Sequence, residues 1–275
     1  QSFGRFTYSV LYIEIRDDFG LSNTAAGGIG SLNLVGYLIG SLLVAFTIGN
    51  FGLIKTAKYG LAGVVIGLLL LSWSPNSFIA LLALFLTGLS AAGVWITTPA
   101  LATNLLGPDR KGLAIGWVTT GVGLGFFAAC VFDAVITDWR SVYGLETIIG
   151  FAALGMLVLT ITTSANPASG SGLSPTALKQ IPGWLNLCVT YGFFAVGVSL
   201  AMTFSAALLE EDAGFKEGSA SLTFALIGLG LALGGPIMGW LSDRIGMNSA
   251  QLVSLTCLTV SCALIATGHP VAAPI

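Results

Sequence analysis

The most informative feature of this sequence is how little charge it carries. Only 8% of the 275 residues are Asp, Glu, Lys or Arg, whereas 55% are hydrophobic and the mean hydropathy is +0.92. A soluble domain carries about 25% charged residues, so this chain cannot cover a water-exposed surface of its size. The net charge of −2 leaves no basic excess that would indicate nucleic acid as a partner. The composition therefore predicts an integral membrane protein that lies in a lipid bilayer.

Histidine and paired cysteines are also scarce. The single histidine, His269, stands beside a proline at the end of an apolar run and has no ligand partners nearby. The cysteines lie inside apolar runs without a CxxC motif, which indicates buried, inert thiols: Cys130, Cys188, Cys257 and Cys262. There is no HExxH motif and no nucleophile paired with a base. We therefore expect no metal site, no cofactor and no enzymatic activity.

Apolar runs of about 20 residues, the length that spans a bilayer, repeat along the whole chain. The expected spans are 3–15 (cut short at its start), 26–48, 56–74, 77–105, 113–136, 143–163, 184–208, 220–241 and 248–267. The segment 164–182 is rich in Ser, Pro and Gly and predicts a flexible linker. Because the chain has no initiator Met and no signal peptide, we expect it to be a fragment of a longer protein.

Positive charges alternate between the two sets of connections. One set holds most of them: Lys55, Lys58, Arg110, Lys111, Lys179 and Arg244. The other set holds three, among many acids: Arg16, Arg140 and Lys216. The positive-inside rule places the first set in the cytoplasm, so the linker 164–182 is expected to be cytoplasmic and the first helix to run outward.

The chain also repeats itself at a shift of 194 residues. The shift aligns these pairs: Gly20 with Gly214, Ala26 with Ala220, Gly36 with Gly230, Gly40 with Gly234 and Gly52 with Gly246. Chance matching in a glycine-rich chain is the alternative, but the flanking loops agree as well. The pattern predicts two parallel-repeat bundles, an N-terminal one at 1–163 and a partial C-terminal one at 183–275.

The stretch from Ile227 to Gly246 joins a glycine-rich apolar run to a polar end. It closes with Gly239, Leu241, Asp243, Arg244 and Gly246. This pattern resembles the Gly-x-Leu-x-Asp-Arg-x-Gly loop signature of the major facilitator superfamily of secondary transporters. The resemblance implies an all-α bundle of two pseudo-repeated six-helix halves, here truncated to about nine spans. In the first repeat Gly49 and Asn50 replace the Asp-Arg pair, so that copy of the signature is degenerate.

Further motifs resemble the YbfB/YjiJ-like branch of bacterial transporters. They are Gly4-Arg5-Phe6-Thr7-Tyr8, Asp18-Phe19-Gly20-Leu21-Ser22, Gly93-Val94-Trp95, Pro99-Ala100-Leu101, Gly116-Trp117-Val118 and Trp139-Arg140. The sequence departs from the branch at Ile13 and Glu14, where we would expect proline and an apolar residue. The resemblance implies a monomeric, multi-pass protein of the bacterial inner membrane that moves a small molecule by alternating access.

Arg5 is the leading candidate for binding that molecule. A cation within the membrane is costly and persists mainly where it faces a cavity or a partner, although snorkelling to headgroups is the alternative. Tyr8 shares its helix face and is a possible second ligand group. Other polar or amphipathic residues within the spans complete the substrate-binding set, although some of them only bond within their own helix: Asn33, Trp95, Trp117 and Tyr191.

Proton coupling would need a carboxyl group within the membrane. Glu14, Asp133 and Glu146 are the acids nearest the membrane, all expected near the outer ends of their spans, where ordinary solvation is the alternative. We select Asp133 first and Glu14 second. Gly239, Asp243, Arg244 and Gly246 are expected to form a cytoplasmic gate, in which Asp243 meets a helix N-terminus or a basic residue in one state. A solvated loop pair is the alternative there.

Three other functions fit parts of the sequence. A channel fits the composition, but it explains neither the repeat nor the gate signature. A non-transporting receptor on a transporter scaffold fits every pattern. A membrane-embedded enzyme would need a nucleophile with a base or a metal-binding motif, and the sequence shows neither. A secondary active transporter explains the most features.

Overall fold

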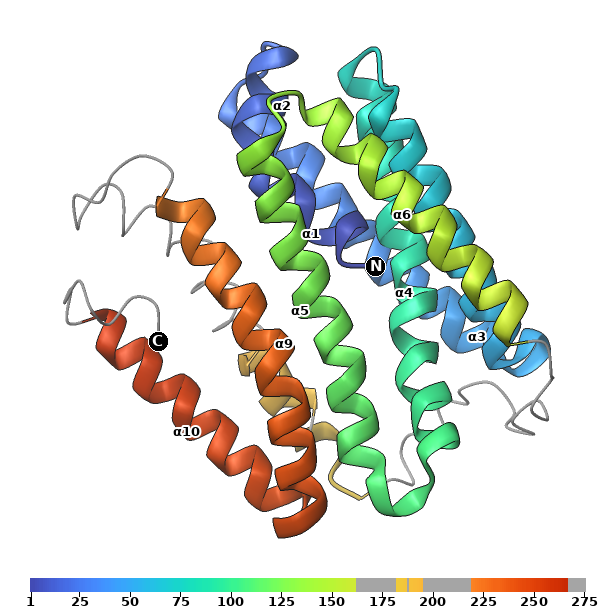
Figure 1. Ribbon diagram of the computed structural model, residues 1–275, viewed down its shortest axis with the longest axis vertical. Coiled ribbons are helices and arrows are strands. Elements are labelled where there is room, and N and C mark those ends of the chain that lie inside the picture. Colours follow the sequence, from blue (N-terminus) through green and yellow to red (C-terminus); the bar gives the residue numbers. More distant parts are fainter. Residues whose placement is uncertain (162–181, 187, 195–218, 267–275) are drawn as a thin grey trace.

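The chain folds into a bundle of long helices. The structure, a computed structural model, describes residues 1–161, 182–186, 188–194 and 219–266 (Figure 1). Its helices are α1 (Phe3–Val10), α2 (Tyr12–Asp18), α3 (Asn23–Ser72), α4 (Ser77–Leu106), the short 3₁₀ helix η1 (Pro108–Arg110), α5 (Lys111–Val135), α6 (Trp139–Thr160), α9 (Ser219–Ile245) and α10 (Met247–Ala266). In the described ranges, six helices are long and apolar enough to cross a membrane: α3, α4, α5, α6, α9 and α10. The prediction of an all-helical membrane protein is therefore confirmed.

Two predicted spans, 26–48 and 56–74, form one run of helix with a sharp turn inside it. At Gly52 the backbone has φ 74° and ψ 166°, and the chain reverses there, so both parts of α3 run between the same two ends of the bundle (Figure 1). Only glycine adopts a positive φ of this kind readily. Gly246, its partner under the 194-residue shift, has φ 86° at the turn between α9 and α10. Two glycines that the 194-residue shift aligns thus both adopt a positive φ at a turn.

The first predicted span differs from expectation because it is divided. It consists of α1 and α2, which meet at Leu11, where φ is −87° and ψ is 9°. Both helices are too short to count among the six membrane-span candidates. The linker 164–182 lies outside the described residues except for its last residue, and most of the seventh span, 195–208, lies outside them as well.

Polar side chains set the starts of the helices. Ser22 caps α3 and Asn76 caps α4, each accepting a hydrogen bond from a backbone N–H three residues ahead. Asp138 caps α6. Hydrogen bonds from the Ser141 hydroxyl and from the backbone N–H groups of Arg140 and Ser141 lower the pKa of the Asp138 carboxyl below its ordinary value. A charged cap therefore marks the start of α6.

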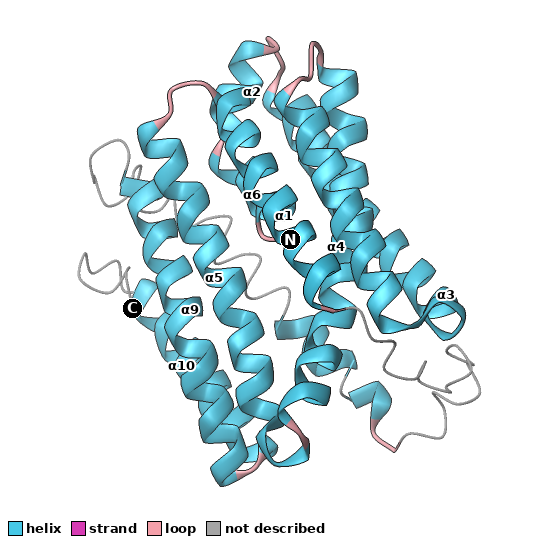
Figure 2. Ribbon diagram, turned by 45° about the vertical axis from the view of Figure 1, so that its right-hand side comes forward, coloured by secondary structure: helices cyan, strands magenta, loops and turns pink. Residues whose placement is uncertain are grey.

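The turns gather at the two ends of the bundle (Figure 2). The end with the turns near Gly52, Gly107 and Gly246 carries five of the basic residues predicted to share one side: Lys55, Lys58, Arg110, Lys111 and Arg244. Lys179 lies outside the described residues. At the opposite end, the Arg140 guanidinium donates to the Ser74 carbonyl at 3.0–3.1 Å and pairs with Asp18 at 2.9 Å. This contact joins the start of α6, the end of α2 and the turn before α4.

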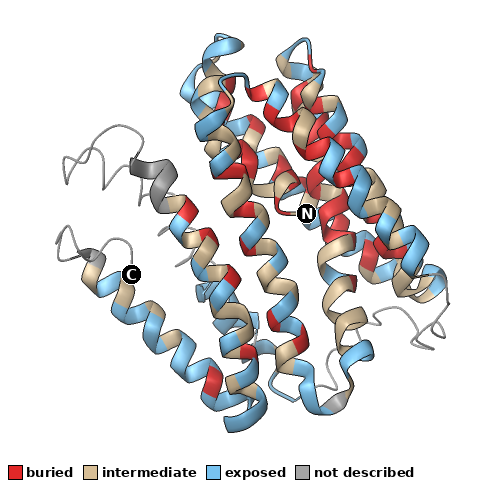
Figure 3. Cartoon of the chain, in the orientation of Figure 1, coloured by how far each residue is buried: buried red, intermediate tan, exposed pale blue. Residues whose placement is uncertain are grey.

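The core lies among the first six helices (Figure 3). Its largest fully buried side chains include Leu11, Leu68, Leu84 and Tyr143, whereas α10 is exposed along most of its length. The most extensive helix contact is between α3 and α4. The next is between α5 and α9, which lie side by side in both ribbon views (Figures 1 and 2). That contact brings helices from the two predicted bundles together.

Glycines permit the approach of α5 to α9. A Cβ atom added at Gly116 would collide with the backbone of Gly235, and one added at Gly235 would lie 2.6 Å from the Gly116 carbonyl oxygen. The same relation holds for Gly112 with Gly239, and for Gly123 with Gly228. Because lipid gives helices no hydrophobic drive to associate, such backbone contact supplies the packing that holds them together.

Candidate functional site

Arg5 presents a charged group that has no anionic partner among the residues that the structure describes. Its guanidinium carbon lies 4.3 Å from the ring centroid of Tyr37 on α3 and 5.5 Å from that of Phe6. Its Nε is buried without a hydrogen-bond partner, and neither of the two ion pairs in the described part of the chain involves it. Cation–π contact stabilises such a charge by about 0.5–2 kcal/mol and leaves its N–H donors free. The group can therefore accept a planar anion such as a carboxylate.

Tyr191 belongs to the same neighbourhood as Arg5. It lies in the helical residues 188–194, is 65% exposed and interacts electrostatically with Tyr37. Tyr37 on α3 thus contacts Arg5 of α1 and interacts electrostatically with Tyr191 of the segment after the linker. The sequence analysis selected Arg5 and Tyr191 but missed Tyr37. Tyr37 follows Asn33 by four residues, and this one-turn spacing would have placed it with that buried residue rather than at the site, so the sequence offered no signal for it.

Tyr8 and Asn33 lie in the interior and have partners there. The Tyr8 hydroxyl donates to the Ala26 carbonyl at 2.8 Å. The Asn33 amide nitrogen donates to the carbonyls of Gly4 and Leu84 and to the Thr87 hydroxyl at 2.8–2.9 Å. Both side chains are buried, so each ties helices together. Tyr8 therefore does not share the surroundings of Arg5.

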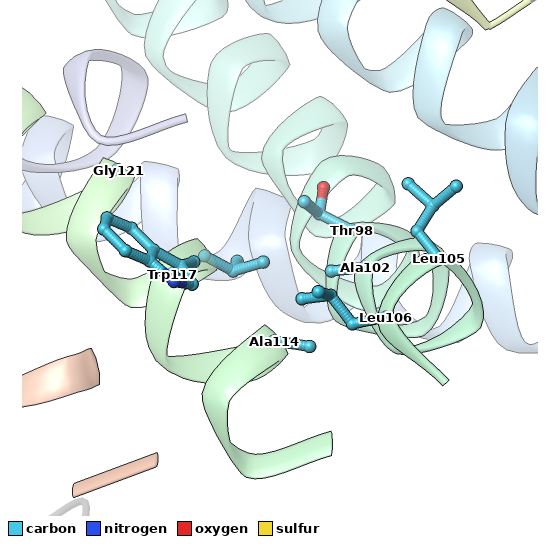
Figure 4. A pocket seen from close by; sticks show the side chains of 8 residues that line it. Thr98, Ala102, Leu105, Leu106, Ala114, Trp117 and Gly121 are labelled. Atoms are coloured by element: carbon cyan, nitrogen blue, oxygen red, sulfur yellow. The ribbon is translucent and has the colours of Figure 1, made fainter. Parts of the chain in front are cut away.

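Trp117 lines a groove between α4 and α5. The groove has a volume of about 470 Å³ and is lined by Thr98, Ala102, Leu105, Leu106, Ala114, Trp117, Val118 and Gly121 (Figure 4). Trp117 is 59% exposed, and the Thr98 hydroxyl is occupied by the Val94 carbonyl at 2.6 Å. Trp95 is half-buried and does not line this groove. The groove offers an apolar wall rather than a set of polar ligand groups.

The two acids selected for proton coupling lie near the end of the bundle that holds Arg140. Glu14 on α2 and Asp133 on α5 are half-buried, and Glu14 interacts electrostatically with Asp133 and Asp138. Glu146 differs from the expectation, because it is 0% exposed rather than solvated near the end of its span. Its position seven residues into α6 puts it about 10 Å below the helix start.

Asp243 lies against the N-terminus of α5. One carboxylate oxygen accepts from the backbone N–H of Gly112 at 2.7 Å and the other accepts from that of Leu113 at 2.9 Å. The first N–H groups of a helix have no partner inside the helix and carry partial positive charge, so a carboxylate satisfies them well. Gly239 packs against Gly112, and the Arg244 guanidinium lies 4.0 Å above the Trp240 ring. Asp243 thus ties the basic ends of α5 and α9 together.

Metal ligands do not gather anywhere in the part of the chain that the structure describes, where no group of three His, Cys, Asp or Glu side chains forms. Of the four cysteines, only Cys130 is buried; Cys188, Cys257 and Cys262 are exposed. The prediction of four buried thiols was therefore wrong for three of them. In a membrane protein, an exposed apolar thiol can face lipid.

The long apolar helices and the contact of Asp243 with α5 are consistent with the transporter family that the loop signature indicates. The sequence matches the Major Facilitator Superfamily over residues 1–275. The chain belongs to this superfamily, whose members are membrane transporters and not enzymes.

Curated relatives span several activities. The chain is 28% identical to monocarboxylate transporter 9 of Pongo abelii, over 54% of this chain and 29% of the relative. It is 23% identical to the gentisate transporter of Corynebacterium glutamicum, over 97% of this chain and 64% of the relative. It is also 23% identical to the transcription regulatory protein OpdE of Pseudomonas aeruginosa, over 79% of this chain and 56% of the relative. The chain thus spans between 29% and 64% of the lengths of these relatives.

Proposed function

We propose that the protein containing this chain is a secondary active transporter that moves a small carboxylate across the membrane by alternating access. The observation that carries the proposal is the Arg5 guanidinium, which lies between Phe6 and Tyr37 with no anionic partner among the described residues. A carboxylate would supply that partner through paired N–H···O bonds. Two relatives are named for carboxylate cargo, monocarboxylate transporter 9 and the gentisate transporter.

The proposed site uses the described residues as follows. Arg5 binds the carboxylate, and Tyr37 and Tyr191 flank it with aromatic faces and hydroxyl groups. Trp117 and Trp95 belong to the apolar wall of the transport path. Tyr8 and Asn33 hold the helices behind the site, a role favoured by their backbone partners. An aromatic lining suits a cargo that carries a ring beside its carboxylate.

Asp243 is proposed as the gate on the cytoplasmic side. Its two bonds to the N-terminus of α5 would hold α5 and α9 together while the path is open to the other side. Gly239 allows the close contact, and Gly246 allows the turn that aims the carboxylate. Arg244 remains on Trp240 in this state and would be free to move in the other. The alternating exposure of the site then follows from making and breaking this one contact.

Several finer points belong to the same proposal. We place the basic end of the bundle and the linker 164–182 in the cytoplasm of a bacterial cell, with the protein as a monomer of the inner membrane. The two-bundle division, the YbfB/YjiJ-like branch and proton coupling are parts of this proposal as well. Because the relatives are longer, we propose that transport needs further helices and that the 275 residues alone move no solute.

A transport assay tests the cargo and the role of Arg5. The transporter is reconstituted in vesicles and given gentisate, benzoate and lactate, together with benzamide, which has the shape of benzoate without its charge. We expect carboxylate uptake to fall at least about tenfold in Arg5→Ala, since losing a charged hydrogen bond costs roughly 1.5–3 kcal/mol. Arg5→Lys keeps the charge and should retain part of the uptake.

The matched control is Arg16→Ala, because Arg16 is already paired with Asp17 and should leave uptake unchanged. Equal uptake by the wild type and Arg5→Ala would remove Arg5 from the site. Uptake of benzamide as readily as benzoate would contradict a carboxylate site.

A receptor is the second candidate, and one relative favours it. OpdE is named as a transcription regulatory protein and aligns with 79% of this chain. A receptor would bind a carboxylate at Arg5 without moving it. Binding that depends on Arg5, with no uptake of any compound in the panel, would therefore support the receptor over the transporter.

A further inference from the structure

A buried carboxyl group, Glu146 on α6, lies outside the site and the gate described above. It is 0% exposed and is the one carboxyl or basic side chain among the buried residues that the structure describes. The other buried residues of α6 are aromatic, aliphatic or small, with one threonine: Trp139, Val142, Tyr143, Thr147 and Gly150. An acid in such surroundings calls for a function or a compensating partner.

Among the described residues, Glu146 has one neutral hydrogen-bond partner, which reaches only one of its two carboxyl oxygens. The Thr7 hydroxyl donates to Glu146 Oε1 at 2.6 Å, and Thr7 itself is 0% exposed. Glu146 Oε2 is buried and has no hydrogen-bond partner in the described part of the chain. An ionised carboxylate left with one bare oxygen is strongly disfavoured away from water. This geometry suits the acid form, with the proton on Oε2.

The groups around Glu146 provide no permanent counter-charge. On α6, the buried Tyr143 hydroxyl interacts with it and has no partner of its own in the described ranges. On the α1 side, Tyr8 interacts with Tyr143, and the α-amino group of Gln1 is the one cation that interacts with Glu146, without forming an ion pair among the described residues. From α3, Val65 and Leu68 pack one turn further along, at Gly150.

We infer that Glu146 is the group that binds and releases the transported proton, an inference that rests on the transporter function proposed above. On release, the O–H bond at Oε2 breaks, the proton passes to water on the open side, and the electron pair stays on the carboxylate. On loading, water from the other side returns a proton to Oε2. One proton and one carboxylate anion then cross together as an uncharged pair.

Helix α1 connects the proton to the cargo. Arg5 and Thr7 are two residues apart, and at about 100° per residue they point to nearly opposite sides of the helix. Thr7 faces Glu146, and Arg5 faces Tyr37. When Glu146 loses its proton, its negative charge strengthens the hydrogen bond from the Thr7 hydroxyl. The proton at Glu146 and the carboxylate at Arg5 therefore both act on the short helix α1. Glu14 and Asp133 are only half-buried and lie near the loops, whereas Glu146 is 0% exposed; Glu14 shares with Glu146 an Oε2 atom that has no hydrogen-bond partner in the described part of the chain.

Glu146→Gln is the variant that separates proton transfer from packing. Its amide oxygen still accepts from Thr7, but it cannot release a proton. In vesicles with gentisate on both sides, wild type and variant should exchange labelled gentisate at similar rates. With a gradient of one pH unit, the wild type should accumulate gentisate about tenfold, since one unit is a factor of ten in proton activity. Glu146→Gln should not accumulate it beyond protein-free vesicles.

The matched controls are Glu14→Gln and Asp133→Asn, which should accumulate gentisate like the wild type. Gentisate accumulation by Glu146→Gln at the wild-type level would overturn the inference. The inference would also fail if Glu14→Gln or Asp133→Asn lost gentisate accumulation while Glu146→Gln kept it. Absence of gentisate, benzoate and lactate transport in the wild type would instead refute the transporter function, and the inference with it.

Infrared spectroscopy covers the case in which Glu146→Gln loses exchange as well. The chain is purified with an N-terminal tag, which converts the α-amino group of Gln1 into a peptide nitrogen. We expect a carbonyl band of a protonated carboxyl group that disappears reversibly as the pH is raised and is missing from Glu146→Gln. The inference would be contradicted if the wild type and Glu146→Gln had the same bands in the region of protonated carboxyl groups.

Discussion

Asn33 and Tyr37 lie one turn apart on α3 and face different surroundings. Asn33 is 4% exposed, and its amide nitrogen joins α1, α3 and α4 through three hydrogen bonds. Tyr37 is only half-buried and receives the Arg5 guanidinium on its ring. A shift of about 40° around the helix axis between positions i and i+4 is enough to move a side chain from the core to the edge of the site.

Asp243 is the residue whose charge should decide how tightly the basic ends of α5 and α9 hold together. In Asp243→Asn only one side-chain oxygen remains to accept from the helix N–H groups, because the amide nitrogen is a donor, and the charge that favours this helix end is lost. Because the residue is exposed, we expect a loss of about 1 kcal/mol, or about a fivefold shift toward separated helices. Electron-spin distances between labels at positions 109 and 247 measure that shift.

Arg244→Gln is the control for this prediction. Arg244 stacks on Trp240 of its own helix and makes no described contact with α5, so its distance distribution should match the wild type. If Asp243→Asn also matched the wild type, the two backbone bonds would contribute nothing to closure.

At the scale of elements, the contact between α5 and α9 depends on which glycines face it. A Cβ atom added at Gly235 would collide with the Gly116 carbonyl oxygen and the Thr119 side chain, whereas one at Gly234 would meet nothing within 4 Å. The Thr120 hydroxyl adds a hydrogen bond to the Ala232 carbonyl at 2.8 Å across the same contact. Adjacent positions on one helix therefore have opposite tolerance to a methyl group.

We expect Gly235→Ala to lower the thermal unfolding temperature in detergent, because its methyl group would push the helices apart at a cost of about 1–3 kcal/mol. Gly234→Ala should be neutral or stabilising, since alanine favours a helix by about 1 kcal/mol over glycine. Equal unfolding temperatures for the two variants would show that α5 and α9 do not depend on this packing.

For the whole molecule, the two ends of the bundle should face opposite sides of the membrane. Trp73, at the turn before α4, is 83% exposed, and Leu105, near the opposite end of α4, is 81% exposed. In a background without the native cysteines, a membrane-impermeant maleimide should label Trp73→Cys on intact cells. It should label Leu105→Cys only after the cells are opened. The reverse pattern would invert the orientation derived from the basic residues.

The sequence predicted the helices and turns more fully than it predicted the side chains of the site. Hydrophobic length placed most of the spans within a few residues, whereas the repeat paired Gly52 with Gly246 without predicting that both lie at turns. The surroundings of Glu146 could not be obtained this way, because its depth and burial depend on Thr7, which is distant in sequence. Tyr8 and Tyr37 differ for the same reason: the direction of a side chain in a bundle is set by helices packed from elsewhere.

The bond between Asp243 and α5 has a consequence for genetics. Its donors are the main-chain N–H groups of Gly112 and Leu113, and only proline lacks such a group. Most amino-acid replacements on the donor side therefore leave the donors in place, and at Gly112 they act through bulk instead. Missense changes that abolish the contact chemically should fall almost entirely on one codon, that of Asp243. On the donor side, Gly112 is the position where added bulk would break the contact, because a Cβ atom there would lie 2.7 Å from Asp243 Oδ1.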